Sequence, residues 1–164
     1  MNRIWRVMAA LLLLVVLAGV LGAQGPAEAG TRIAAGSARF VTCDISIDSG
    51  AAALGAWQID WSGSIAGGSV ELVGVEGGEP GAYAQPAYYD PEALTHGRVV
   101  LGAFSTAKPD GLPRGKTRVA RLHLRVVADE PNAKVEMTTK VMAAADGDGK
   151  TIEPKASAAL GDNP

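Results

Sequence analysis

The sequence of 164 residues has a single cysteine, Cys43, which excludes any intrachain disulfide. A fold without covalent crosslinks must be stabilised by the packing of its core. Cys43 falls on the apolar side of an alternating segment, where a lone thiol is usually a small buried hydrophobic group. We therefore expect a buried thiol, with a reactive thiol or an intermolecular bridge as the alternative.

Histidine is almost as scarce, and the sequence has no catalytic motif. The two histidines, His96 and His123, do not stand at the spacing of zinc ligands with an acidic partner. No glycine-rich phosphate loop precedes a helix, and there is no nucleophile elbow. We predict a protein without enzymatic activity and without a cofactor, in which both histidines are exposed.

Neither sign of charge dominates the chain. It has 15 lysines and arginines against 17 acidic residues, a formal net charge of −2. This balance gives no electrostatic reason to expect nucleic acid or an anionic membrane surface as a partner. Contact with a membrane is expected only through the N-terminal leader, before its cleavage.

The N-terminus has the composition of an export signal. Arg3 and Arg6 precede an apolar run of about 15 residues, shorter than the roughly 20 that a membrane-spanning helix needs, and small residues follow it. We predict a signal peptide over residues 1–23, with cleavage as late as residue 29 or a retained anchor as alternatives. The protein is then exported, to the periplasm, the cell surface or the medium. Residues 24–37, rich in Gly, Ala and Pro, are expected to form a flexible lead-in.

The remaining length allows one domain with a single core. Removing the leader leaves about 135 to 140 residues. Apolar and polar residues alternate through this part with the period of two typical of half-buried strands, and turn residues separate the alternating segments. No segment after the leader has a convincing helical pattern, so we predict an all-β, two-sheet sandwich over residues 38–160. The expected strands are 40–47, 54–61, 69–75, 98–104, 117–127 and 135–141, with a further strand after Lys155.

Segment 117–127 has the clearest alternation. Its apolar side chains share one face, and Arg121 and Arg125 lie on the opposite face, where we expect them to lack acidic partners. Segment 98–104 is a nearly continuous apolar run, as in a strand from the middle of a sheet. Trp57 and Trp61 share the apolar phase of segment 54–61 and are predicted to be buried, with a sugar-stacking platform as the alternative.

A long loop is expected between residues 79 and 96. Its three prolines exclude a regular helix or a central strand. Its three tyrosines, Tyr83, Tyr88 and Tyr89, have two interpretations: they fold over the end of the sandwich, or they stack on the sugar rings of a polysaccharide.

The order of these segments resembles that of cohesin domains. FVTCDISI is followed by GAWQIDW, by a tyrosine- and proline-containing excursion that ends in GRVVLGAFS, and then by TRVARLHLRV. Cohesins are nine-stranded jelly-roll modules related to one group of carbohydrate-binding modules. The resemblance implies a jelly roll of about nine strands and a non-catalytic module for binding or assembly. Its partner would be a protein, dockerin-like or another envelope protein.

The resemblance also implies where the partner would bind. One sheet face, built from segments 69–75, 98–104 and 135–141, would carry the contacts. The candidate contact residues are Glu71, Glu136, Thr138 and Lys140. The alternative is that these are ordinary solvent-side residues, and that the protein binds carbohydrate through the loop tyrosines.

A short acidic motif stands near the C-terminus. Asp146 and Asp148, each followed by glycine, resemble the start of an EF-hand calcium loop. The later oxygen ligands and the glutamate at loop position twelve are missing. We expect a turn, with weak calcium binding by the two carboxylates as the alternative.

Overall fold

The computed structural model describes residues 37–130 and 132–161. The predicted signal peptide, and the predicted lead-in up to residue 36, lie outside the described residues. The described chain forms eight strands and two single turns of 3-10 helix. The strands are β1 (Ser37–Asp48), β2 (Leu54–Ile65), β3 (Gly68–Gly77), β4 (Tyr88–Tyr89), β5 (Arg98–Phe104), β6 (Lys116–Ala128), β7 (Val135–Asp146) and β8 (Lys155–Gly161). The helical turns are η1 (Pro91–Ala93) and η2 (Pro109–Gly111).

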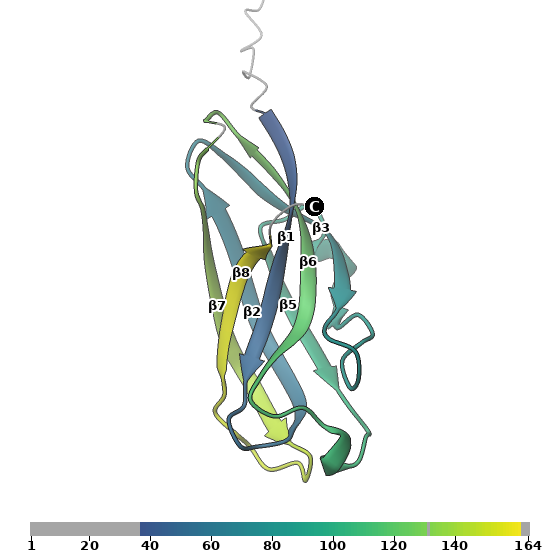
Figure 1. Cartoon of the computed structure of the whole chain (residues 1–164). Coiled ribbons are helices and arrows are strands. Elements are labelled where there is room, and N and C mark those ends of the chain that lie inside the picture. The colour runs from purple at the N-terminus through teal and green to yellow at the C-terminus, as the bar shows by residue number, and fades with distance from the viewer. Residues whose placement is uncertain (1–36, 131, 162–164) are drawn as a thin grey trace, which may run out of the picture. The chain divides into compact units, whose positions relative to one another are not determined.

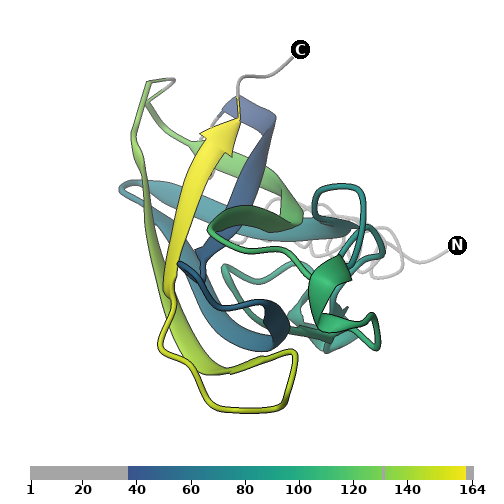
Figure 2. The ribbon, with the colours of Figure 1, turned by 60° about the horizontal axis from the view of Figure 1, so that its bottom comes forward.

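The strands form two antiparallel sheets that pack face to face (Figures 1 and 2). The first sheet has the order β3-β6-β1-β8 and the second the order β4-β5-β2-β7. Every strand pairing within them is antiparallel. The predicted all-β, two-sheet architecture is confirmed, with eight strands in the described residues where about nine were expected. The further strand predicted after Lys155 is β8.

The core lies between the sheets and is formed by the apolar faces of the long central strands. Trp57 and Trp61 of β2 are buried, as predicted, and pack in one cluster with Leu122 and Leu124 of β6. Cys43 of β1 is completely buried in the same cluster. Burial raises the pKa of its thiol to about 11, because the thiolate would lose its hydration. The expectation of a buried thiol is confirmed.

Strand β5 corrects one prediction. Its apolar run was expected to lie in the middle of a sheet, but among the strands that the structure describes only β2 pairs with β5 along its length. On its other side the two-residue strand β4 covers only Leu101 and Gly102. Val99 and Leu101 point into the core, and Val100 and Phe104 are exposed. The run is therefore apolar on both faces although only one face is buried.

Candidate binding surface

The outward side chains of the second sheet form one continuous surface, here called the outer face. Trp57, Ile59 and Trp61 of β2 point into the core, so the residues between them point outward. Cross-strand partners share a face, and the register therefore assigns the neighbouring residues of β4, β5 and β7 to the same surface. The register assigns to the outer face Gln58, Asp60, Ser62, Tyr88, Arg98, Val100, Phe104, Glu136, Thr138 and Lys140. Met142, which lies at the register shift between Val141 and Ala143, is also exposed and is counted with them.

Exposed apolar side chains concentrate on the outer face. Among the described residues seven large hydrophobic side chains are exposed, and four of them lie here: Tyr88, Val100, Phe104 and Met142. Tyr88 is 74% exposed and Phe104 is 64% exposed. Their ring planes are within 11° of parallel, and the ring centroids are 6.4 Å apart. Exposed apolar patches of this kind often mark surfaces that contact another molecule.

Polar groups lie beside these rings. An open depression of about 600 Å³ is lined by Tyr88, Gln58 and Arg98, with other residues of β4 and β5. Arg98 donates two hydrogen bonds to the carboxylate of Asp60, from Nε to Oδ1 at 2.9 Å and from Nη2 to Oδ2 at 2.7 Å. These hydrogen bonds lower the pKa of Asp60 below its ordinary value. The outer face thus presents the exposed apolar side chains of Tyr88, Val100 and Phe104 near the ion pair between Arg98 and Asp60.

The four candidate contact residues divide between the two sheets. Glu136, Thr138 and Lys140 lie together on the outer face, where they form its β7 border. Glu71 lies in β3, on the opposite side of the sandwich, and its Oε2 accepts a hydrogen bond from Arg125 at 2.8 Å. The expected single face was wrong in this respect, because β3 pairs with β6 and belongs to the first sheet.

The three loop tyrosines have different environments. Tyr83 is buried, with its hydroxyl donating to the carbonyl of Leu54 at 2.9 Å and its ring against that of Trp57 at a centroid distance of 6.0 Å. Burial raises its pKa to about 12. Tyr89 is half-buried and packs against the core. Tyr83 therefore follows the first interpretation, in which the loop tyrosines fold over the sandwich, and it cannot stack on a sugar; of the three tyrosines, only Tyr88 is exposed on the outer face.

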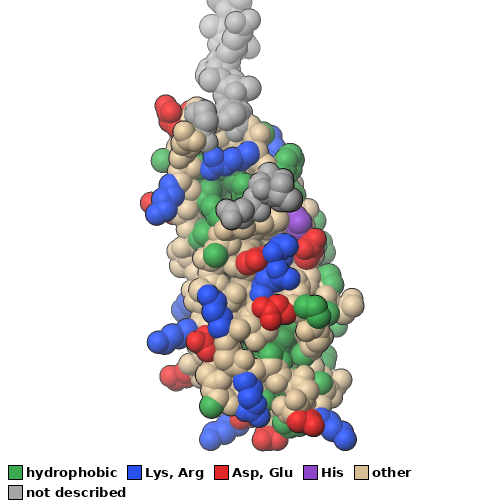
Figure 3. All heavy atoms as spheres, viewed as in Figure 1, with side chains coloured by type: hydrophobic (Ala, Val, Ile, Leu, Met, Phe, Trp, Pro, Cys, Tyr) green, Lys and Arg blue, Asp and Glu red, His purple; other side chains and the backbone are tan. Residues whose placement is uncertain are grey.

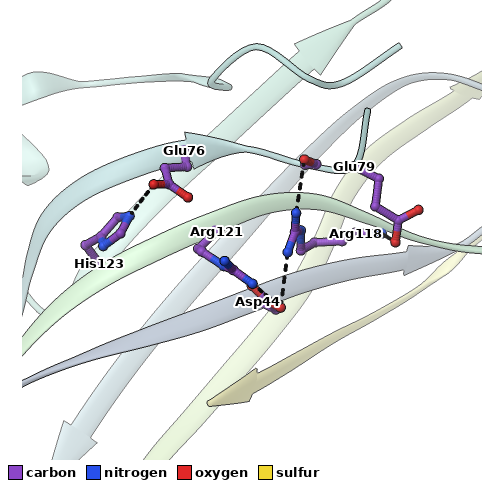
Figure 4. Close-up of polar contacts among 7 residues, drawn as sticks. Asp44, Glu76, Glu79, Arg118, Arg121 and His123 are labelled. Atoms are coloured by element: carbon purple, nitrogen blue, oxygen red, sulfur yellow. Dashed lines mark hydrogen bonds and ion pairs between the residues drawn. The ribbon is translucent and has the colours of Figure 1, made fainter. Parts of the chain in front are cut away.

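The outward side of the first sheet carries several ion pairs (Figure 4), and Figure 3 shows basic and acidic side chains close together on it, among hydrophobic and uncharged areas. Arg121 binds Asp44, and the Nε2 atom of His123 lies 3.1 Å from Oε1 of Glu76. Arg125 pairs with Glu71, as noted above. The expectation that Arg121 and Arg125 lack acidic partners was wrong, because the register places carboxylates of β1 and β3 beside β6. His96 is exposed as predicted, whereas His123 is only partly exposed.

The acidic motif near the C-terminus forms a turn, as expected. Oδ1 of Asp146 accepts hydrogen bonds from the backbone N–H groups of Asp148 and Lys150, at 3.0 and 2.9 Å. This carboxylate oxygen therefore stabilises the turn between β7 and β8. Within residues 37–130 and 132–161, no three histidine, cysteine or acidic side chains are grouped closely enough to hold a metal ion.

The exposed apolar residues of β5 on the outer face, Val100 and Phe104, were not singled out from the sequence. Their segment was assigned to a strand in the middle of a sheet from its continuous apolar run, although their positions alternate with those of Val99 and Leu101. The signal that could have revealed them is this alternation, because residues of opposite phase on a strand point to opposite faces. The ion pair between Arg98 and Asp60 needs the register of β2 and β5, which no local pattern supplies.

Comparison of the chain with protein-family models, with curated proteins and with solved structures gives no match. In the part of the chain that the structure describes, no helix has the length and apolar character required to cross a membrane.

Proposed function

We propose that this chain is an exported, non-catalytic binding module, a cohesin-like jelly roll that binds a protein partner through its outer face. The observation that carries the proposal is the pair of exposed rings, Tyr88 and Phe104, with Val100 beside them. Aromatic side chains are enriched at the centres of protein interfaces, where they bury a large area at a low cost in conformational entropy. The partner is expected to offer a complementary apolar patch with polar groups around it.

The charged side of the first sheet suits a partner less well. Its arginines already have carboxylate partners, so a second protein would have to compete with these ion pairs or cover them. Covering them removes charged groups from water, which is costly unless new partners replace the lost hydration. On the outer face, by contrast, the exposed groups next to the rings include uncharged side chains such as Gln58 and Val100.

Carbohydrate is the second candidate ligand of the same face. A sugar ring stacks on a flat aromatic surface, and Tyr88 and Phe104 present nearly parallel planes. Gln58, Asp60 and Arg98 supply donors and acceptors for hydroxyl groups nearby.

Substitution of the two rings tests both candidates. The double variant Tyr88→Ala/Phe104→Ala should lose binding, whereas Phe40→Ala should retain it, because Phe40 is an equally exposed aromatic residue, at 61%, on the first sheet. Each protein is immobilised and exposed to an envelope extract of the producing organism, and a captured protein is identified by mass spectrometry and retested as a purified pair. The same three proteins are applied to a polysaccharide array. Binding that survives in the double variant and is lost in Phe40→Ala would contradict the assignment of the face.

A further inference from the structure

Strand β7 has one side without a partner strand over most of its length. It pairs with β2 on one side, and among the described residues no strand pairs with residues 135–143 on the other. Beyond that stretch a hairpin continues the pairing, with the N–H of Ile152 donating to the carbonyl of Ala144 at 3.0 Å. Figures 1 and 2 show β7 at the margin of the sandwich, next to β8. An open edge of this kind offers backbone donors and acceptors to another strand.

A groove runs along this open edge. It has a volume of about 670 Å³ and lies between residues 134–139 and residues 156–158 of β8. The side chains of β8 that line it are small: Ala156, Ser157 and Ala158. On the β7 side, Met137 and Thr139 are half-buried in the phase that points toward the core. A strand added to β7 would therefore find space for its own inward side chains.

The side chains of β7 are complementary to a second copy of β7 in the antiparallel direction. If Thr138 faces Thr138 of the second copy, Glu136 faces Lys140 of the second copy, and Lys140 faces Glu136. Both contacts join opposite charges on the solvent side, which stabilises cross-strand pairs. On the inward side Val135 faces Val141. Every contact occurs twice, as a two-fold axis requires.

Neighbouring registers lack this complementarity. A shift of two residues in one direction places Lys134 opposite Lys140 of the second copy. A shift of two in the other direction places Glu136 opposite Met142 and Lys140 opposite Thr138, so neither charge has a partner. A shift of one residue would place residues whose N–H and C=O groups point to the open edge opposite residues whose N–H and C=O groups point to β2. The two strands could then not form their backbone hydrogen bonds.

The charges needed for this contact are accessible. Glu136 and Lys140 are exposed, and neither forms an ion pair with another of the described residues. Asp60 lies beside Lys140 in the register and attracts it, but the carboxylate of Asp60 binds Arg98 through two hydrogen bonds, so Lys140 is not fixed in an ion pair.

We propose that two copies of this chain associate through β7, with Thr138 on the two-fold axis. The two second sheets then join into one sheet of eight strands, with the order β4-β5-β2-β7-β7-β2-β5-β4. This inference is independent of the proposed ligand of the outer face. The competing role for the same residues is protection: lysines on an edge strand often prevent edge-to-edge association.

Crosslinking between engineered cysteines tests the register. In the full chain, Thr138→Cys places two thiols opposite one another across the axis, at the Cα separation of directly paired residues, about 4.5 to 5.5 Å. The matched control is Met142→Cys, also exposed on β7, whose two copies lie about 27 Å apart because eight residues separate Met142 from the position that faces it. A short bismaleimide should convert Thr138→Cys to a covalent dimer and leave Met142→Cys and the wild type monomeric on a denaturing gel. The native Cys43 is buried and should not react.

Charge reversal tests the contacts themselves. Glu136→Lys and Lys140→Glu should each weaken the dimer about tenfold in sedimentation equilibrium, because each creates two like-charge contacts. The double variant Glu136→Lys/Lys140→Glu should restore it, and an equimolar mixture of the two single variants should form a heterodimer. Glu92→Lys, an exposed charge reversal in η1, is the control for net charge, and circular dichroism checks the fold of each variant.

Three results would overturn the proposal. These are a wild type that stays monomeric at high micromolar concentration, a dimer indifferent to both reversals, and equal crosslinking of the two cysteine variants. A wild-type monomer that dimerises only when the lysines are removed would assign them the protective role instead.

Discussion

Arg121 and Asp44 form a two-point ion pair that joins β6 to β1. Nε of Arg121 donates to Oδ1 of Asp44 at 2.6 Å, and Nη2 donates to Oδ2 at 3.0 Å. Arg118 approaches the same carboxylate at 3.5 Å (Figure 4). The two strands are paired directly at this position, since Asp44 faces Arg121 in the register. Asp44 therefore interacts with two arginines of β6 at once.

The stability of the fold should therefore fall in acid through Asp44. The hydrogen bond from Arg121 is the main reason that the pKa of Asp44 lies below its ordinary value. A lowered folded pKa stabilises the protein above the unfolded pKa, about 3.9, and this contribution disappears as the pH falls through the folded pKa. Asp44→Asn should flatten that part of the pH profile of the unfolding free energy, measured by urea denaturation.

The effect at neutral pH should be small. Both side chains are about one-third exposed, so solvent screens the pair and its loss should cost roughly 1 kcal/mol or less. Asp110→Asn, in the exposed turn η2, is the matched control. A profile for Asp44→Asn that runs parallel to that of the wild type would contradict the assigned role.

Tyr83→Phe should destabilise the protein, although the substitution removes only one oxygen. The hydroxyl of Tyr83 donates to the carbonyl of Leu54 inside the core, and the variant leaves this carbonyl without its donor. A loss of about 1 kcal/mol in unfolding free energy is expected. Tyr88→Phe makes the same chemical change at an exposed ring and should have no measurable effect. Equal effects in the two variants would mean that the hydroxyl of Tyr83 does not stabilise the fold.

Cys43 should resist thiol reagents as long as the protein is folded. Its side chain is completely buried, and the pKa of the thiol is raised to about 11, so the thiolate is rare at neutral pH. Labelling with an aromatic disulfide reagent at pH 8 should be slow and should accelerate sharply at the urea concentration where the chain unfolds. Rapid labelling in the absence of urea would show that the core opens locally around β1.

Substitutions on the first sheet should leave partner binding unchanged. Arg125→Ala removes the ion pair with Glu71 but alters nothing on the outer face. Its affinity for a purified partner, measured by calorimetry, should equal that of the wild type, whereas Tyr88→Ala should weaken binding. If only Arg125→Ala weakened it, the charged sheet would be the binding surface.

The sequence predicts where the strands lie better than it predicts which strands pair with one another. Alternation around Trp57 and Trp61 correctly assigns the buried side of β2, because side-chain phase is a local property. Period two does not say which sheet a strand joins, so it could not correct the resemblance to cohesins, which placed Glu71 on one face with Lys140. The burial of Tyr83 could not be predicted either, because its segment is a proline-containing loop without periodicity. Contacts between segments that are distant in the sequence determine both the sheet of β3 and the burial of Tyr83.

The position of β1 in the first sheet has a consequence for the order in which the chain folds. β1 pairs with β6 on one side and with β8 on the other, so the first described strand lies between two of the last three. Its hydrogen-bonding groups are satisfied only after almost the whole domain has been synthesised. Closing such long loops costs entropy before any contact compensates for it, and folding dominated by distant pairings is slow. We therefore expect a chain emerging from the ribosome to remain unfolded until its C-terminal strands are available, and threading through a translocation channel, as the proposed export would involve, requires such an unfolded state.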